Sequence, residues 1–593
     1  MVRWRRLKVL LAGLVVVVGI AGWAGLPANA AEPPTAPTVT ATYQGAQLAN
    51  CLEQTVCPEI VVFDDPVTFT FTTSSPDVVR YRYGFIGEPA QEIDGSSITL
   101  DLRPPEEGWV RLDVQAINSD GQFSTTTAFL FNVAPAPGPV GSWAFDDGSG
   151  TTAADGSGNA HALALNGGAA LDGKGRLDGS LALDGVDDYA QASDSVVDTS
   201  QSFTVSAWAR PTSSTKLGVV AAADGTNSSA FGLGYDPSTK RWVFARTSAD
   251  TRTPTLYRAS SAEAPVNGAW SHLLASYDAS AGELKLFVNG RLQQTTAFPI
   301  AKAWKATGQL TVGSGLYAGA TGGSFAGSLD HVQVWQRVLR ANEITALQDP
   351  RINDRVASGI AARWPLDSAV RGSDRVWRTP ETVRGADLSV SGFGTDQSKA
   401  FVDDPERGKV LELTGAARES VSLTRPVIDG SASFSVAVWV KIGDLSKPMV
   451  IARQGTTAQD AWRLSYQPLD QFTGQYRFAR GHADGSTETV AVSTVDRDSL
   501  EGWHLLIGSY NRTGTGGFGN PDGRIELTVD NRGSDGGQKA YSAPTRTGST
   551  IVGAAATKGA GLIGRLDELR VYAGVLSQSK ACTEFPELDG CGS

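Results

Sequence analysis

The chain has 593 residues, a formal net charge of −11, 67 glycines and four cysteines. This length is sufficient for several domains, each with a substantial core. A strongly acidic surface repels phosphate backbones, so nucleic acid is excluded as an expected partner.

The first 30 residues have the pattern of a secretory signal peptide. Four cations lie within residues 1–8, an apolar stretch covers residues 9–26, and the small-residue site Ala28-Asn29-Ala30 follows. Ordinary export is expected, with twin-arginine export at Arg5-Arg6 as the alternative. Loss of the four cations takes the net charge from −11 to −15. No later stretch approaches the ~18 apolar residues that cross a bilayer, so we expect a secreted, extracellular protein without a membrane anchor.

The four cysteines form two close pairs, Cys51 with Cys57 and Cys582 with Cys591. Four cysteines allow three pairings, and the short separations favour the two local disulfides. By chain entropy, each short loop contributes roughly 2 to 3 kcal/mol, which suits a structural clasp. A metal site made of cysteine alone is the alternative, although neither pair has CxxC spacing. Residues 579–593 are expected to form a disulfide-closed tail.

Residues 31–134 contain short runs in which apolar residues alternate with polar ones. Val67, Phe69 and Phe71 form one such run, and glycine, proline and aspartate separate it from the next. This period of two is typical of half-buried strands and predicts a small β-sandwich. The segment resembles the immunoglobulin-like or fibronectin III-like modules of secreted bacterial proteins. Residues 135–140 are rich in proline and are expected to be a stiff linker.

Two long segments, 141–349 and 358–578, repeat the same landmarks in the same order. Ser202–Trp208 returns as Ser433–Trp439, and the later landmarks return at similar offsets, which indicates a duplicated domain. Asn289-Gly290 follows an alternating apolar run and predicts a tight hairpin. A short helix is expected over residues 341–347.

The ordered landmarks of the first repeat resemble those of the LamG-like jelly-roll domain, a member of the concanavalin A-like lectin/glucanase superfamily. They are Gly179–Tyr189, Phe203–Trp208, Trp270-Ser271-His272, Leu286–Gly290 and Gly327–Leu339. The resemblance implies an all-β protein with two tandem jelly-roll sandwiches behind the small N-terminal sandwich. It does not fix the function, because this fold is shared by lectins, adhesion modules and hydrolases.

Tryptophan is the side chain best suited to stack on a sugar ring. Three tryptophans of the first repeat return in the second, and such shared placement favours core packing. Trp304 and Trp377 have no counterpart and lie among charged residues in expected loops. They are the candidates for a ligand-binding platform, and an edge tryptophan that covers the core is the alternative.

Clusters of acidic residues in the first repeat raise the question of calcium, which takes oxygen ligands from loops. Because members of the superfamily often hold a structural Ca²⁺, the resemblance points first to Asp330. Two loops could assist it, one with Asp184, Asp187 and Asp188, the other with Asp155 and Asn159. The second repeat has Arg418 where the first loop would lie, and a cation there opposes a metal. Solvated turn acids are the alternative.

Catalysis is not expected from this chain. Glu526 and Asp530 are spaced by four on an expected strand, but their counterparts are Lys285 and Asn289. Neither the superfamily's ExDxxE pattern nor a GxSxG run occurs, and the five histidines lack metal-ligand spacing.

The sequence therefore predicts a non-catalytic binding protein of the extracellular space. Its expected ligand is an extracellular or cell-surface glycan. The alternatives are an adhesive scaffold that binds a cell-envelope protein and a cryptic glycoside hydrolase.

Overall fold

The computed structural model describes residues 32–53, 57, 59–63, 65–85, 90–348, 351–352, 355–356, 358–456, 460–481, 488–496, 500–512, 524–532, 548–554 and 561–588. The expected signal peptide, residues 1–30, lies outside these ranges. The chain divides after Pro137 into two compact units. Within the described ranges, no helix is long and apolar enough to span a membrane.

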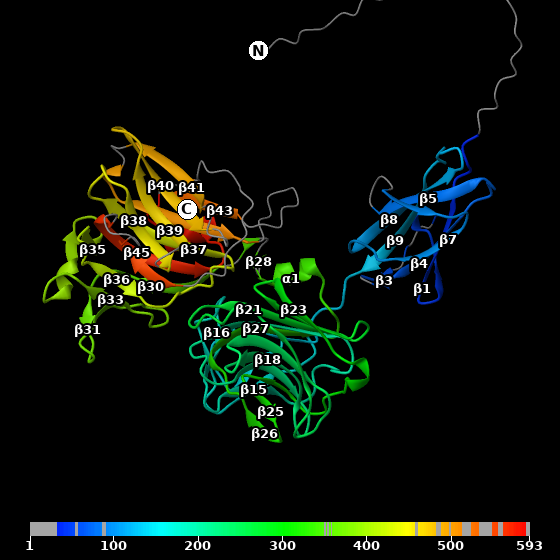
Figure 1. Cartoon of the computed structure of the whole chain (residues 1–593), viewed down its shortest axis with the longest axis horizontal. Coiled ribbons are helices and arrows are strands. Elements are labelled where there is room, and N and C mark those ends of the chain that lie inside the picture. Colours follow the sequence, from blue (N-terminus) through cyan, green and yellow to red (C-terminus); the bar gives the residue numbers. More distant parts are fainter. Residues whose placement is uncertain are drawn as a thin grey trace, which may run out of the picture. The chain divides into compact units, whose positions relative to one another are not determined.

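The first unit is a two-sheet sandwich (Figure 1). Its core is made of alternating side chains such as Phe69, Phe71 and Tyr81, which face inward from successive strands. Cys51, in a short 3₁₀ helix (Cys51–Glu53), forms a disulfide with Cys57. In sheet order, the strands are β2 (Ala46–Leu48), β1 (Thr38–Tyr43), β4 (Val67–Thr72) and β7 (Ile98–Leu102), against β3 (Glu59–Val62), β9 (Thr127–Ala134), β8 (Gly108–Asn118), β5 (Val78–Phe85) and β6 (Gln91–Asp94).

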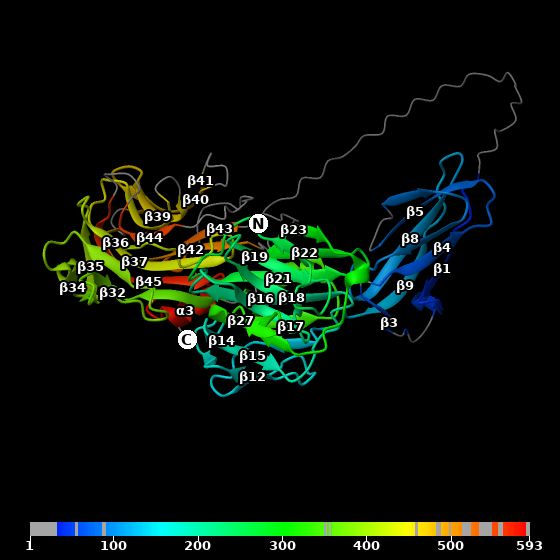
Figure 2. The same ribbon diagram turned by 60° about the horizontal axis from the view of Figure 1, so that its bottom comes forward.

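The second unit contains two jelly rolls, and we call residues 141–348 jelly roll 1 (Figures 1 and 2). One of its sheets has the order β13 (Ala170–Asp172), β14 (Ser180–Asp184), β27 (Ala326–Trp335), β16 (Phe203–Pro211), β21 (Ser271–Asp278), β22 (Glu283–Val288) and β23 (Arg291–Ala297), with β10 (Gly141–Trp143) beside β27. The other has the order β11 (Thr152–Ala153), β12 (Leu163–Asn166), β15 (Tyr189–Ala192), β24 (Leu310–Val312), β17 (Gly218–Asp224), β18 (Ser229–Asp236), β19 (Arg241–Thr247) and β20 (Leu256–Ser260).

Smaller elements complete jelly roll 1. They are a hairpin of β25 (Gly315–Tyr317) and β26 (Ala320–Gly322), a 3₁₀ helix (Ile300–Lys302) and helix α1 (Ala341–Gln348). Helix α1 lies where the sequence predicts it. The Asn289-Gly290 hairpin is also confirmed, since both residues have the positive φ that such a turn requires, 45° and 64°. A strand pair, β28 (Arg351–Ile352) and β29 (Arg355–Val356), follows.

We call residues 358–588 jelly roll 2. One sheet has the order β34 (Phe401–Asp404), β35 (Gly408–Thr414), β45 (Ile563–Ala573), β37 (Phe434–Ile442), β42 (His504–Asn511) and β43 (Arg524–Val529), with β30 (Gly359–Trp364) beside β45. The other has the order β31 (Val370–Arg371), β32 (Trp377–Thr379), β33 (Leu388–Ser391), β36 (Ser420–Leu423), β44 (Ser549–Val552), β38 (Met449–Gly455), β39 (Asp460–Pro468), β40 (Thr473–Gly481) and β41 (Glu488–Asp496). A 3₁₀ helix (Gln397–Ala400) and helix α3 (Gln578–Glu584) complete it.

The two jelly rolls repeat each other in detail. In both, the pairing of the central strand with the last strand shifts register at the same place, before Trp208 in β16 and before Trp439 in β37. The predicted duplication of an all-β sandwich is therefore confirmed.

Trp208 and Trp439 are both buried, but they lie outside the sandwich cores. Phe203, Val205 and Ala207 face the core of jelly roll 1, whereas Trp208 faces the opposite side of the sheet. There Val427 and Ile428 of jelly roll 2 cover Trp208. The end of the chain covers Trp439 instead, through Phe585 and Leu588.

The C-terminal cysteines are only partly described. Cys582, in α3, is disulfide-bonded. Cys591 lies outside the described residues.

Candidate functional site

Jelly roll 1 has a pocket of about 530 Å³ on the sheet of strands β17–β20. The hairpin β25–β26 forms one wall and brings Tyr317 over the sheet. The loop before β20 forms the other wall. The main side chains that line the pocket are Leu217, Asp236, Arg252, Leu256, Arg258 and Tyr317.

Two glycines in β18 leave the pocket floor bare. A Cβ atom on Gly232 would meet only the Tyr317 hydroxyl, at 3.8 Å, so the phenol lies over this position. A Cβ on Gly234 would lie 2.2 Å from the carbonyl oxygen of Gly218, so only glycine fits there. Alternate residues of one strand share a face, and the Gly-Leu-Gly run therefore flattens one side of β18.

Tyr317 offers an aromatic face at the mouth of the pocket. The residue is 41% exposed, while its hydroxyl end points down onto the sheet. Burial of the hydroxyl, with a further contribution from the nearby charge of Asp224, raises the pKa of Tyr317 to about 12. The phenol is therefore neutral and can donate a hydrogen bond throughout the physiological pH range.

The remaining lining combines apolar and charged groups. Leu217 and Leu256 are 37% and 43% exposed. Burial raises the pKa of Asp236, but hydrogen bonds from the hydroxyl and N–H of Ser238 outweigh this effect and lower the pKa. A flat aromatic ring beside guanidinium donors and a carboxylate acceptor can stack on a ligand and hydrogen-bond its hydroxyl groups.

Trp304 lies behind the wall of this pocket. Its indole Nε1 donates to the carbonyl oxygen and hydroxyl of Thr247, at 3.0 and 3.2 Å, and Thr247 lines the pocket. The Trp304 ring packs against the core of jelly roll 1. Trp304 therefore supports the pocket wall. A direct contact between Trp304 and a ligand remains a prediction.

Trp377 lies in β32 of jelly roll 2, far along the chain from this pocket. It is half-buried and packs against the core of jelly roll 2. Its neighbours Asp374 and Arg378 form an ion pair with each other at 2.5 Å. The structure does not bring Trp304 and Trp377 into one site.

The acidic loop of jelly roll 1 brings three carboxylates together. Ligand oxygens of Asp184, Asp187 and Asp188 lie within 4.8 Å of one another. Burial, with the charges of the other two, raises the pKa of Asp188, although the N–H of Asp184 donates to its carboxylate at 2.8 Å. A divalent cation would relieve this accumulated negative charge.

The other candidate calcium ligands lie elsewhere. Asp184 pairs with Ala326, four residues from Asp330 along β27, which corresponds to about 13 Å. Asp330 is fully buried and accepts from the N–H of Leu177 at 3.0 Å and from His331 Nδ1 at 2.6 Å. Burial disfavours the charged form of His331, but the Asp330 carboxylate outweighs it and raises the histidine's pKa. The Asp330 carboxylate is thus already engaged by groups of the protein.

Asp155 and Asn159 are engaged within their own loop. The Asp155 carboxylate accepts from the backbone N–H groups of Ser142, Ser157 and His161, at 2.8 to 3.0 Å. These donors outweigh burial and lower the pKa of Asp155. Asn159 donates to the carbonyl of Val140 at 3.1 Å. These contacts describe a turn closed by its own hydrogen bonds.

Jelly roll 2 differs from jelly roll 1 at both acidic positions. Arg418 takes the place of Asp187, as both carbonyl groups approach an equivalent glycine, Gly392 and Gly167. Asp567 takes the place of Asp330 and pairs with Arg407 at 2.6 Å. Cations of the chain therefore stand at the two places where the resemblance suggested metal in jelly roll 1.

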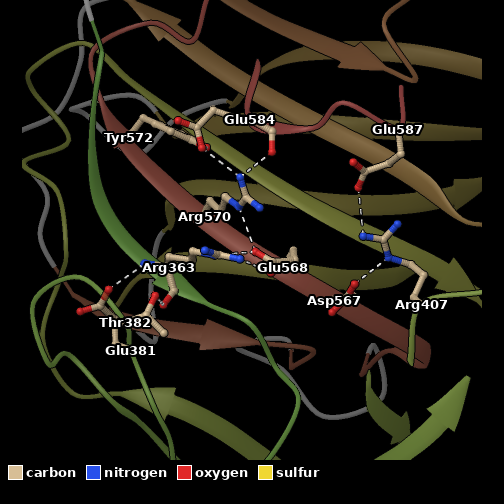
Figure 3. Close-up of polar contacts among 10 residues, drawn as sticks. All are labelled: Arg363, Glu381, Thr382, Arg407, Asp567, Glu568, Arg570, Tyr572, Glu584 and Glu587. Atoms are coloured by element: carbon tan, nitrogen blue, oxygen red, sulfur yellow. Dashed lines mark hydrogen bonds and ion pairs between the residues drawn. The ribbon is translucent and has the colours of Figure 1, made fainter. Parts of the chain in front are cut away.

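Figure 3 shows two neighbouring sets of ion pairs on β45, one around Asp567 and one around Glu568. Glu568 binds Arg363 and Arg570, and Arg570 also binds Glu584 in α3. Arg407 bridges Asp567 and Glu587. These ion pairs fasten the C-terminal segment to the sheet. Their carboxylates are paired, which indicates a structural role.

Glu526 and Asp530 do not form a facing pair of carboxylates. The strand ends at Val529, and Asp530 has a left-handed φ of 46° in the following turn. Asp530 accepts from His504 Nδ1 and from the N–H of Leu505, whereas Glu526 lies beside Arg524. The regular spacing seen in the sequence is therefore broken by the turn.

Sequence reasoning missed the pocket under Tyr317. A signal was present, since β18 places glycine at two alternate positions, and this leaves one face of a strand without side chains. The tyrosine that covers it lies more than 80 residues later.

The two jelly-roll sandwiches define a concanavalin A-like architecture. The chain belongs to the concanavalin A-like lectin/glucanases superfamily, because the model of that family matches residues 184–345 and 415–582, more than half of the chain. None of the curated proteins searched matches it.

Several solved structures show similarity at low identity. Domain 4 of a GH43 extracellular arabinanase from Geobacillus stearothermophilus, in complex with arabinotriose, is 19% identical over 35% of this chain and 98% of its own, with a TM-score of 0.26. The sialidase CBM40 of Ruminococcus gnavus, bound to α2,3-sialyllactose, is 17% identical over 26% and 94%, with a TM-score of 0.22. The binding domain of botulinum neurotoxin serotype D is 10% identical over 61% and 95%, with a TM-score of 0.34. These low similarities carry no functional argument.

Proposed function

We propose that the chain is a secreted, non-catalytic protein that binds an extracellular or cell-surface glycan through the Tyr317 pocket of jelly roll 1. The observation that carries this proposal is the pocket itself, where a partly exposed tyrosine lies over a glycine-flattened sheet beside arginine and aspartate. Apolar sugar faces stack on aromatic rings, and sugar hydroxyls require both donors and acceptors. Membership of a superfamily of lectins and glucanases agrees with this class of ligand.

A glycan array with the full chain tests the proposal, and Gly232→Leu is the decisive variant. The leucine side chain would occupy the pocket floor beneath the Tyr317 phenol without meeting backbone, because a Cβ atom on Gly232 meets only the Tyr317 hydroxyl. We expect the wild-type chain to bind a defined set of glycans and the variant to lose them. Equal binding by both would refute the pocket as the site.

The alternatives from the sequence are tested in the same preparation. An adhesive scaffold would capture a cell-envelope protein in a pull-down and bind no glycan. A glycoside hydrolase would release reducing sugar from a polysaccharide panel.

A further inference from the structure

Jelly roll 1 has a second pocket, and a turn of jelly roll 2 fills it. Asn289 Nδ2 donates to Asp429 Oδ2 and to Ser431 Oγ, at 2.7 Å each. Ser271 Oγ lies 3.4 Å from the same Asp429 carboxylate. All four residues are buried, and about 40 Å³ of space remains. The pocket thus receives a carboxylate that projects from a tight turn.

In the part of jelly roll 2 that the structure describes, a pocket is left at the equivalent place. Asp530 stands where Asn289 stands in jelly roll 1, since each follows the matching strand with a φ of 46° or 45°. Each also accepts from a backbone N–H of the neighbouring strand, that of Leu505 at 2.9 Å or His272 at 2.8 Å. A pocket of about 660 Å³ surrounds Asp530. Its lining includes Asp496, Trp503, His504, Arg532 and Glu587.

The exchange of asparagine for aspartate reverses the chemistry of the pocket. Asn289 donates a hydrogen bond to its occupant, whereas the Asp530 carboxylate can only accept. Asp496 and Glu587 add two further carboxylates, while Arg532 and the His504 imidazole, whose Nδ1 contacts Asp530, lie among them. Arg407, which borders Trp503 at 5.8 Å, is paired with Asp567 and Glu587. The half-buried Trp503 ring also favours a cation.

A second copy of this chain does not fit the pocket. Jelly roll 1 carries the counterpart of the filling turn at Asp198–Ser200, where Ser200 donates to Asp198 through N and Oγ at 2.9 and 2.6 Å. Ser431 donates to Asp429 in the same way, at 2.9 and 2.8 Å. Asp198 of another copy would meet Asp530, and two carboxylates in one partly buried site repel each other.

We propose that the Asp530 pocket of jelly roll 2 is a docking site for a tight turn of a partner protein that presents a lysine or arginine. The turn would enter as Asp429–Ser431 enters jelly roll 1, with a cation in place of the carboxylate. This interaction is independent of the glycan pocket and uses the other jelly roll.

Two synthetic peptides test the docking site. Both copy residues 427–433, one with the natural Asp429 and one with Asp429→Lys, and each is titrated into the full chain by calorimetry. The lysine peptide is expected to bind at least tenfold more tightly and to weaken with added salt. In the Asp530→Asn variant, which restores the residue used by jelly roll 1, this preference should disappear or reverse.

Glu283→Gln, on the surface of jelly roll 1, serves as the matched control and should leave both affinities unchanged. Because asparagine retains the oxygen that accepts from Leu505, Asp530→Asn should melt within a few degrees of wild type. Equal affinities for the two peptides, no binding of either at millimolar concentration, or a lysine preference that survives Asp530→Asn would each overturn the proposal. Displacement of the lysine peptide by a glycan that binds the wild-type chain would overturn it too.

Discussion

Arg407 and Asp567 are joined by a short ion pair, with the guanidinium Nε 2.6 Å from the carboxylate. The guanidinium also lies 4.2 Å from the ring centroid of Trp439. Burial raises the pKa of Asp567 to about 6, even though the arginine opposes this shift. Arg407 therefore compensates the buried negative charge of Asp567 on β45.

Arg407→Met removes this cation and keeps an apolar stem over Trp439. The free energy of unfolding should fall by about 3 kcal/mol at pH 8, because a buried carboxylate loses its partner. The raised pKa of Asp567 contributes stability that is present below about pH 4 and is lost as the pH rises through 6. The variant's deficit should therefore shrink at pH 4.5. Urea unfolding followed by tryptophan fluorescence measures it, and an equal deficit at both pH values would contradict the prediction. In Arg407→Met/Asp567→Asn the pH dependence of the deficit should vanish.

Tyr317→Ala should weaken glycan binding about tenfold, whereas Tyr317→Phe should retain most of the affinity. The reason is that stacking uses the ring, and a loss of about 1.4 kcal/mol corresponds to one factor of ten. Isothermal titration with the best glycan from the array gives both values. A larger loss in Tyr317→Phe than in Tyr317→Ala would assign the recognition to some other group.

Glycan affinity should also be independent of tyrosine ionisation up to about pH 10. Burial raises the pKa of Tyr317 to about 12, so the phenol stays protonated over this range. Titrations at pH 7 and pH 10 provide the measurement. A sharp loss by pH 10 in wild type that is absent in Tyr317→Phe would show that the hydroxyl ionises earlier.

Calcium is predicted to bind jelly roll 1 through Asp184, Asp187 and Asp188, and to stabilise without catalysing. A ligand present at a hundredfold excess over its dissociation constant adds about 2.7 kcal/mol to the folded state. Melting curves with calcium and with chelator should differ for wild type. Asp187→Arg, which copies Arg418 of jelly roll 2, should abolish the difference, and Asp330→Asn should leave it intact. Should neither calcium nor chelator move the wild-type curve, the three acids are ordinary turn residues.

The Cys51–Cys57 disulfide should stabilise the first unit alone. Its short loop corresponds to about 2 kcal/mol by chain entropy. Cys51→Ser/Cys57→Ser is expected to speed hydrogen exchange in β3 and β9, while the jelly rolls exchange as before. Accelerated exchange in jelly roll 1 would show that the effect is not local.

The sequence predicts the strands well because their determinants are local. The alternation of Phe203, Val205 and Ala207, the Asn289-Gly290 turn and the duplicated landmarks each act over a few residues. The Tyr317 pocket escapes such reasoning because Tyr317 is far from β18 in the sequence and meets it only in the folded chain. The alternation of Phe203, Val205 and Ala207 places Trp208 on the other face of β16, but the distant segment near Val427 that covers it cannot be inferred from local sequence.

The candidate calcium ligands show the same contrast between features set by local sequence and features set by the fold. The replacement of the acidic loop by Arg418 can be inferred from the aligned repeats. The separation of Asp330 from Asp184 depends on strand register, which the spacing of acids in the sequence does not contain.

Trp208 and Trp439 occupy equivalent positions, but different segments of the chain cover them. Jelly roll 2 brings its own cover, the tail after α3, wherever it is placed in a chain. Jelly roll 1 depends on its neighbour, because Val427 and Ile428 belong to the next domain. A chain cut after Gln348 would expose the indoles of Trp208 and Trp270, and a chain without jelly roll 1 would in turn expose Val427 and Ile428. Recombination can therefore extend this protein behind jelly roll 2 but cannot separate the pair.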